Sequence, residues 1–237
     1  MSTVSPTLCP VPASASDDRV DLHFLRRGRG IEFEMEVRWV ERHIPAGVDR
    51  VVEIGCGNGR LLERLGPRRV IGVDLCADGL SRTRVALPGA CLICCPGDQI
   101  PMDDGSANVV IAQHLLEHLI DHRAALAEWF RLLAPGGLLL LLTPNRDFAD
   151  PRIFDDPTHV HLFDRRDLER AVGSSGFSLL EMRTLGLPWF RTIKLRSVWR
   201  LRRFLIEWAV GVSGMPFWRW KGQTLCCAAC KPSSEDR

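Results

Sequence analysis

The sequence has little net charge, no long apolar run and no leader-like start. Its 31 Lys and Arg residues against 29 Asp and Glu leave a net charge of +2, so no overall basic field favours nucleic acid, and we expect no such partner. Residues 132–144, the longest uncharged apolar stretch, are shorter than the roughly 20 residues that cross a bilayer. Residues 1–16 lack a basic start and an apolar run, which favours a cytoplasmic protein.

The composition is that of an ordinary folded protein. Hydrophobic residues make up 46% and charged residues 25% of the 237 positions, which excludes a disordered chain and a disulfide miniprotein. The nine cysteines are an odd number, and without a leader we expect reduced thiols. Cys94, Cys95, Cys226, Cys227 and Cys230 fall in predicted strands and are expected to pack in the core, so no metal site is predicted there.

Short apolar runs alternate with amphipathic segments along the chain. This rhythm predicts an α/β fold with βαβ units and a mainly parallel sheet. Asp121 and Asp164 are expected to cap the fourth and fifth helices. The predicted strands are 50–54, 69–75, 90–95, 107–112, 138–143, 177–182 and 223–230, and the predicted helices are 31–44, 58–65, 77–87, 121–133 and 164–172. We expect a flexible tail at 1–17 and one domain over 18–237.

A glycine loop follows the first predicted strand. Gly55, Gly57 and Gly59 alternate between the end of this strand and the start of a helix, which allows a tight turn and a close approach of the backbone to a ligand. Asp74 ends the second strand, 21 residues after Glu53, where an acid accepts hydrogen bonds from ribose hydroxyls. The spacing is GxGxG rather than GxGxxG, which favours a nucleoside-containing cofactor other than NAD.

Five motifs in order resemble those of the class I S-adenosylmethionine-dependent methyltransferases, small-molecule branch. The resemblance covers residues 48–183 and the last strand. The motifs are Glu53-Ile-Gly-Cys-Gly-Asn-Gly59, Val73-Asp74-Leu75, Gly97-Asp-Gln-Ile-Pro-Met102, Asn108-Val-Val-Ile-Ala-Gln-His-Leu-Leu-Glu-His118, and Leu133-Ala-Pro-Gly-Gly137 followed by a leucine strand. The family usually has Asp where Asn108 stands, an acid that supports the strand end.

The resemblance implies a doubly wound, mainly parallel seven-stranded sheet of Rossmann-like type with an antiparallel last strand. It also implies S-adenosylmethionine as cofactor and a cofactor-binding core over 48–145. Gly55, Gly57 and Gly59 would shape the loop around the methionine half of the cofactor, with Glu53 orienting the loop. Asp74 would hold the ribose and Asp98 the adenine amino group, and Gln113 would contact the methionine end through its backbone. Leu75 and Gln99, beside the two acids, complete the expected cofactor-binding set.

Two histidine clusters compete for a role in catalysis. The first, His114-Leu-Leu-Glu117-His118, reads literally as a zinc-protease pattern, but its place after a buried strand favours a turn braced by Glu117 and His118. The second lies in Asp156-Pro-Thr-His159-Val-His161 after the fifth strand, on the side where such sheets bind ligands. We hypothesise that His159 or His161 touches the acceptor, as a general base, and the alternative is that both only brace the loop and the next helix.

Residues 185–221, between the last two predicted strands, form a basic and tryptophan-rich insert. They hold eight of the Lys and Arg residues, one acid and five of the seven tryptophans. As a helix, 195–212 would place Arg196, Arg200 and Arg203 on one stripe and apolar residues over most of the rest. Such a helix would serve as a lid on the acceptor pocket, as a homodimer seam, or as a contact with a membrane surface.

The sequence therefore predicts methyl transfer from S-adenosylmethionine to a small-molecule or lipid-like acceptor, at oxygen. The protein would be cytoplasmic, or peripheral to the inner face of a membrane. An alternative of another class is a cofactor-binding regulatory or scaffold protein that does not catalyse, and a nicotinamide dehydrogenase ranks third. An in-line transfer needs mainly proximity and orientation, so a general base is optional.

Overall fold

The computed structural model describes residues 31–65, 69–148, 155–186 and 221–233. The predicted tail at 1–17 lies outside these residues, as does all of the predicted insert except Leu185, Gly186 and Lys221. No helix among the described residues is long and apolar enough to cross a membrane.

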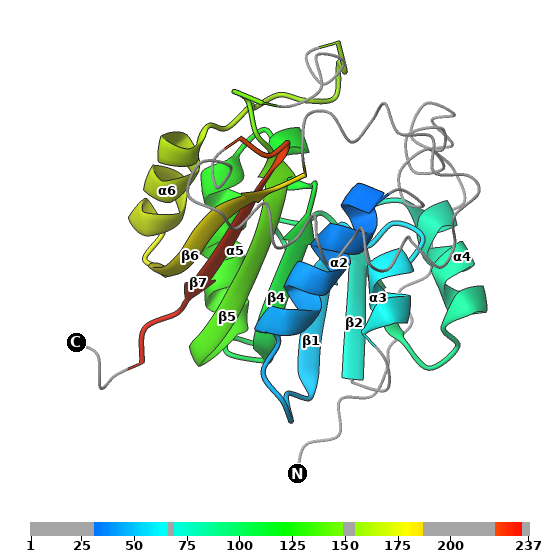
Figure 1. The fold of residues 1–237 in the computed structure, drawn as a ribbon. Coiled ribbons are helices and arrows are strands. Elements are labelled where there is room, and N and C mark those ends of the chain that lie inside the picture. Colours follow the sequence, from blue (N-terminus) through cyan, green and yellow to red (C-terminus); the bar gives the residue numbers. More distant parts are fainter. Residues whose placement is uncertain (1–30, 66–68, 149–154, 187–220, 234–237) are drawn as a thin grey trace.

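Seven strands form one sheet in the order β3-β2-β1-β4-β5-β7-β6 (Figure 1). The strands are β1 (Arg50–Ile54), β2 (Arg69–Asp74), β3 (Cys91–Cys94), β4 (Ala107–Gln113), β5 (Leu133–Pro144), β6 (Ser178–Leu185) and β7 (Thr224–Cys230). The pairs among β1 to β5 are parallel, whereas β7 runs antiparallel to both β5 and β6. The predicted doubly wound sheet with an antiparallel last strand is confirmed.

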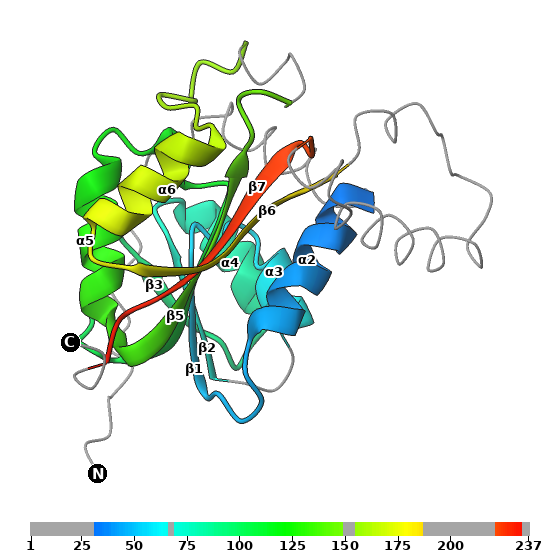
Figure 2. The same cartoon turned by 60° about the vertical axis from the view of Figure 1, so that its left-hand side comes forward.

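Helices cover both faces of the sheet. They are α2 (Ile31–His43), α3 (Arg60–Arg64), α4 (Ala77–Ala86), α5 (His122–Leu132) and α6 (Arg165–Ser174), with the short 3-10 turn η1 (Leu116–His118) after β4. Figure 2 shows α5 and α6 on one side of the sheet and α2, α3 and α4 on the other. Successive strand residues serve opposite sides: Val51 packs with the α2 side and Val52 with the α5 side.

Side-chain caps fix two helix starts where the sequence placed them. Asp121 accepts hydrogen bonds from the backbone N–H groups of Arg123 and Ala124 at 3.1 and 3.0 Å. Asp164 accepts one from the N–H of Asp167 at 2.8 Å. Each bond satisfies a backbone donor that has no partner inside the helix.

Two strands are longer than the sequence predicted. β5 begins at Leu133, because Leu133 pairs with Ala107 across an irregularity in the ladder, and Lys231 exchanges backbone hydrogen bonds with Gly136 and Gly137. The Leu133-Ala-Pro-Gly-Gly137 segment, which lies before the predicted strand, therefore runs along the sheet. β6 continues to Leu185, so the first residue of the predicted insert belongs to a strand.

Trp129 ties helix α5 to the loop after β3. Its side chain is fully buried, and its Nε1–H donates to the Gly97 carbonyl oxygen at 2.8 Å. One residue earlier, Glu128 Oε1 accepts from the Ile100 N–H at 2.7 Å. Both bonds hold the backbone on either side of Asp98, so α5 sets the position of this predicted adenine contact.

Replacing Trp129 with Phe is expected to keep most of the apolar burial while removing the indole donor. Leaving the Gly97 carbonyl without this donor should cost about 1–3 kcal/mol, which corresponds to a melting temperature lower by about 2–4 °C per kcal/mol. Thermal unfolding followed by circular dichroism measures this. Trp39→Phe is the control, because its 3.4 Å bond to Glu181 lies away from the Gly97 loop. Equal destabilisation by the two variants would contradict the assignment.

Candidate active site

The site lies where the strand order reverses. From β1 the chain builds outward through β2 and β3, and then it returns to add β4 on the other side of β1. In open α/β sheets ligands bind at the carboxyl ends of the strands beside this reversal. The glycine loop follows β1 and residues His114–His118 follow β4, so both predicted segments meet at this position.

The three glycines of the loop all need the left-handed backbone. Gly55, Gly57 and Gly59 have φ angles of 75°, 52° and 72°, a region that other residues enter at a cost. The loop closes on β2 through hydrogen bonds from the N–H groups of Gly55 and Cys56 to the Val73 carbonyl, at 2.8 and 3.0 Å. The sequence prediction of a tight turn at this strand end is confirmed.

Helix α4 supports the loop through residues that sequence reasoning missed. The hydroxyl of Thr83 is buried and donates to the Gly57 carbonyl at 3.0 Å. A Cβ on Gly59 would come within 2.4 Å of Thr83 Cγ2, and one on Gly79 within 2.9 Å of the Gly57 carbonyl oxygen. The only available signal was a pair of small residues on a predicted helix, which does not show what the helix packs against.

Two buried carboxyl groups lie beside the loop with unequal surroundings. Asp74 accepts hydrogen bonds from the Gly57 N–H and the Cys76 N–H, both at 2.7 Å. Burial raises the pKa of Asp74, and these backbone donors oppose the rise. Burial and the nearby Asp74 carboxylate raise the pKa of Glu53 well above its ordinary value, and its Oε2 atom has no hydrogen-bond partner.

The predicted adenine and ribose contacts lie at open edges of the same site. Leu75, next to Asp74, is 72% exposed although it is apolar, so it offers a surface that a ring could cover. Asp98 is half-buried and Gln99 exposed in the loop that Trp129 holds. A carboxylate has about four lone-pair positions, so Asp74 can accept ribose hydroxyls while it keeps its two backbone donors.

Helix α2 contributes a buried acid, Glu36, that no sequence motif singled out. Glu36 accepts hydrogen bonds from Gln113 Nε2 and Thr224 Oγ1, both at 2.7 Å, and its Oε1 lies 3.0 Å from His114 Nε2. Burial would raise the pKa of Glu36, but the His114 imidazole and these donors hold it below its ordinary value. His114 has φ 54°, so the network holds a non-glycine residue in the left-handed region at the end of β4.

The two histidine clusters meet in the folded chain. The His114–His118 segment contains a short 3-10 turn, so it is not a regular α-helix. His114 pairs with Glu36. The Glu117 carbonyl accepts from the N–H groups of Val160 and His161 at 2.9 and 3.1 Å, which fixes the 155–163 loop on this turn. The rings of His118 and His159 are then 4.8 Å apart.

The two candidate acceptor residues have different surroundings. The side chain of His159 is 2% exposed, with its Nε2 3.8 Å from Asp156 Oδ2. His161 Nε2 bonds the Ile120 carbonyl at 3.0 Å, and its ring lies 4.7 Å from the His122 ring beside an open depression of about 550 Å³ between α5 and α6. Both residues lie against the turn after β4, but the His159 ring faces His118 of that turn whereas the His161 ring faces His122 of α5.

The described cysteines are free thiols. Cys226 and Cys227 are buried in β7, and Cys94 and Cys95 are partly buried at the end of β3. This placement agrees with the predicted packing role.

Comparisons with known proteins agree with this geometry. A family model described as a methyltransferase domain matches residues 23–182. The chain belongs to the class I S-adenosylmethionine-dependent methyltransferases. It is 33% identical over 149 residues to a probable S-adenosylmethionine-dependent methyltransferase of Mycolicibacterium smegmatis, a match that covers 61% of this chain and 57% of that protein.

A ubiquinone biosynthesis O-methyltransferase of Thiobacillus denitrificans is 30% identical over 120 residues, which cover 48% of this chain and 52% of that one. This methyltransferase thus spans little more than half the length of these two relatives. Among solved structures, phosphoethanolamine N-methyltransferase 2 of Haemonchus contortus, in complex with S-adenosyl-L-methionine, has a TM-score of 0.63 at 17% identity. That match covers 85% of this chain and 53% of the other, and it shows the shared fold.

The site of this methyltransferase fits the family's cofactor, S-adenosylmethionine. The left-handed glycines bring backbone to the loop surface, Asp74 has lone pairs to spare, and Leu75 presents an uncovered apolar side chain. Glu53 keeps a buried carboxylate oxygen without a hydrogen-bond donor, which an ammonium group or a water beside it would satisfy. The residues predicted to hold the cofactor, an assignment that stays a prediction, are Glu53, Gly55, Gly57, Gly59, Asp74, Leu75, Asp98, Gln99 and Gln113.

Glu53→Gln is expected to stabilise the ligand-free protein. A carboxyl whose folded pKa is raised lowers the stability of the fold progressively as the pH rises above its ordinary value. The amide removes that charge and places a donor near Asp74 in place of a repelling oxygen. The melting temperature should rise by about 2–4 °C per kcal/mol gained, and the gap to the wild type should widen from pH 4 to pH 7.

Asp74→Asn is the matched comparison, because it also neutralises a buried acid of the loop. In this variant the amide nitrogen would face a backbone N–H that donates to the carboxylate in the wild type. Because two donors cannot form a hydrogen bond with each other, the melting temperature should fall. Thermal unfolding of both variants across this pH range measures the contrast. A fall for both variants would show that Glu53 is held by a partner in the folded protein.

Proposed function

We propose that this protein transfers a methyl group from S-adenosylmethionine to a hydroxyl oxygen of a small-molecule or lipid-like acceptor. The observation that carries the proposal is the glycine loop closed on Asp74 at the strand reversal, in a chain of the methyltransferase family. Bound S-adenosylmethionine supplies a methyl group activated by its sulfonium charge. The acceptor oxygen bonds to the methyl carbon as the carbon–sulfur bond breaks, giving S-adenosylhomocysteine, and the hydroxyl proton passes to solvent or to a nearby base.

Support for oxygen as the acceptor atom comes from the relative in Thiobacillus denitrificans, which is named a ubiquinone biosynthesis O-methyltransferase. Support for a lipid-like acceptor comes from the composition of 185–221, with its eight Lys and Arg residues and five tryptophans. Aromatic and basic side chains together suit the boundary between water and an apolar phase. We infer from the same composition a peripheral contact with an anionic membrane surface.

Calorimetric titration of the full chain with S-adenosylmethionine and S-adenosylhomocysteine tests the cofactor. Asp74→Ala should weaken both affinities at least tenfold, because it removes a carboxylate whose hydrogen bonds to ligand hydroxyls are worth about 1.5–3 kcal/mol. Asp78→Ala is the control, since Asp78 is exposed on the first turn of α4 only four residues away. Equal weakening by the two substitutions would contradict the role given to Asp74.

Acceptor screening separates catalysis from binding alone. The protein is incubated with S-adenosylmethionine and with matched polyprenyl phenol, catechol and amine acceptors, and S-adenosylhomocysteine and methylated product are measured by mass spectrometry. Product from the hydroxyl acceptors supports the proposal. Product from the amine alone overturns oxygen specificity. Tight cofactor binding with no S-adenosylhomocysteine from any acceptor favours the non-catalytic alternative.

A further inference from the structure

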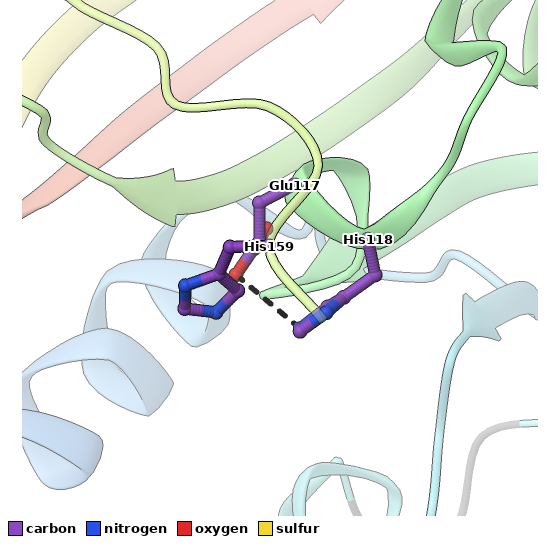
Figure 3. Close-up of side chains that lie close together, drawn as sticks. All are labelled: Glu117, His118 and His159. Carbon is purple, nitrogen blue, oxygen red and sulfur yellow. Dashed lines mark ion pairs between the residues drawn. The ribbon is translucent and has the colours of Figure 1, made fainter. Parts of the chain in front are cut away.

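We propose that Glu117, His118 and His159 form a site for one divalent transition-metal ion. These residues come from the η1 turn and from the 155–163 loop, and they point toward one another (Figure 3). One ligand-capable atom of each lies within 4.8 Å of the others. Neither histidine cluster shows this set in the sequence, because the two segments are about 40 positions apart.

The separations within the cluster are too long for hydrogen bonds and somewhat wider than those of ligands that share one ion. Glu117 Oε1 is 3.9 Å from His118 Nε2. Two ligand atoms at about 2.1 Å from a tetrahedral ion are about 3.4 Å apart, and they cannot exceed about 4.2 Å. The Glu117–His118 separation must therefore close by about half an ångström, and the widest separation in the cluster, up to 4.8 Å, by as much as about 1.4 Å, a shift within reach of side-chain rotation.

The groups around the cluster orient it as outer partners orient metal ligands. The Nδ1–H of His118 donates to the Thr158 carbonyl at 3.0 Å, so in the neutral ring the lone pair is on Nε2, which is turned to Glu117. Thr143 Oγ1 donates to Glu117 Oε2 at 3.0 Å and leaves Oε1 toward the imidazoles. Asp156 Oδ2, 3.8 Å from His159 Nε2, is near enough to orient that ring or to become a fourth ligand.

Charge also favours a cation at this position. The side chain of Glu117 is fully buried, and a buried carboxylate is costly unless opposite charge lies beside it. Its near neighbours among the described residues are a hydroxyl and imidazoles, whose charge depends on protonation. Two imidazoles and one carboxylate are the donor set of catalytic zinc and of other transition metals that keep an open coordination position.

The site follows β4, whose last residue Gln113 belongs to the predicted cofactor set. The role we assign to the ion rests on the proposed function: it would take the acceptor hydroxyl as a ligand and lower its pKa. The hydroxyl proton would pass to solvent, and the oxygen would then bond to the methyl carbon as the carbon–sulfur bond breaks.

Metal binding is tested without reference to activity. Chelator-treated full-length protein is titrated calorimetrically with Zn²⁺, Mn²⁺ and Mg²⁺, and we expect one equivalent to bind, in that order of affinity. His118→Ala and His159→Ala should each weaken Zn²⁺ binding at least tenfold. His43→Gln is the control, because His43 pairs with Glu181 away from the site. Equal affinities in all of these proteins, or no binding at all, would overturn the site.

Two further readouts keep the result clear. The absorption spectrum of the Co²⁺-loaded protein should lack the intense near-ultraviolet band that thiolate ligands produce. The presence of this band would assign the ion to cysteine instead. Thermal unfolding checks that each variant folds. If an alanine variant does not fold, Glu117→Gln provides a second test, because it preserves the side-chain shape and one acceptor oxygen.

The metal's role in the reaction is separated from any effect on cofactor binding. Cofactor affinity should be unchanged by His159→Ala, while chelator and His159→Ala each reduce methyl transfer at least tenfold and Zn²⁺ or Mn²⁺ restores the chelated enzyme. Bound metal with transfer that resists chelation would overturn its role in activating the acceptor. Bound metal without transfer to any acceptor would overturn the proposed function and leave the metal site standing.

Discussion

The closure of the glycine loop on the end of β2 is the constraint from which the rest of the site follows. The backbone N–H groups of Gly55 and Cys56 donate hydrogen bonds to the Val73 carbonyl, and the N–H of Gly57 donates one to the Asp74 carboxylate. This arrangement needs three left-handed residues in five positions, a requirement that only glycine meets at low cost. Once the loop is fixed, α3 and α4 must start beside it, and Thr83 and Gly79 are the contacts that make room for them.

Three of the buried acids of the site are stabilised in different ways. Asp74 is held by backbone donors, Glu36 by a histidine and two side-chain donors, and Glu53 has one oxygen without a donor. The difference follows from what each acid faces. Glu36 joins α2, β4 and β7 and completes its bonds within the chain, whereas Glu53 lies against the loop that receives the ligand. A buried oxygen without a hydrogen-bond donor is expected where a bound ligand supplies the missing donor.

Local patterns carry most of the fold but only half of the site. The strands at 50–54, 69–74 and 107–113 are apolar runs whose ends carry the glycines and acids, so spacing along the chain is enough to place them. The bonds of Glu36 to Gln113 and Thr224 join residues 77 and 188 positions apart. The contact of His118 with His159 likewise depends on how the 155–163 loop returns to the η1 turn. Tertiary packing of this kind produces no periodicity or spacing in the sequence. β5 begins earlier than predicted for a related reason, because its first residues pair with β4 and with Lys231, the residue after β7.

The two halves of the site are therefore under different physical control. The cofactor half is one contiguous turn with a neighbouring strand end, and a change elsewhere reaches it only through helices packed on it. The other half depends on Glu117, whose carbonyl holds the 155–163 loop while its carboxylate faces Thr143 and the imidazoles. Because one residue sets both the path of the loop and the charge within it, we expect changes in 155–163 to alter the proposed acceptor side without disturbing the glycine loop. Such a separation would let the fold keep one cofactor while the loop adapts to different acceptors.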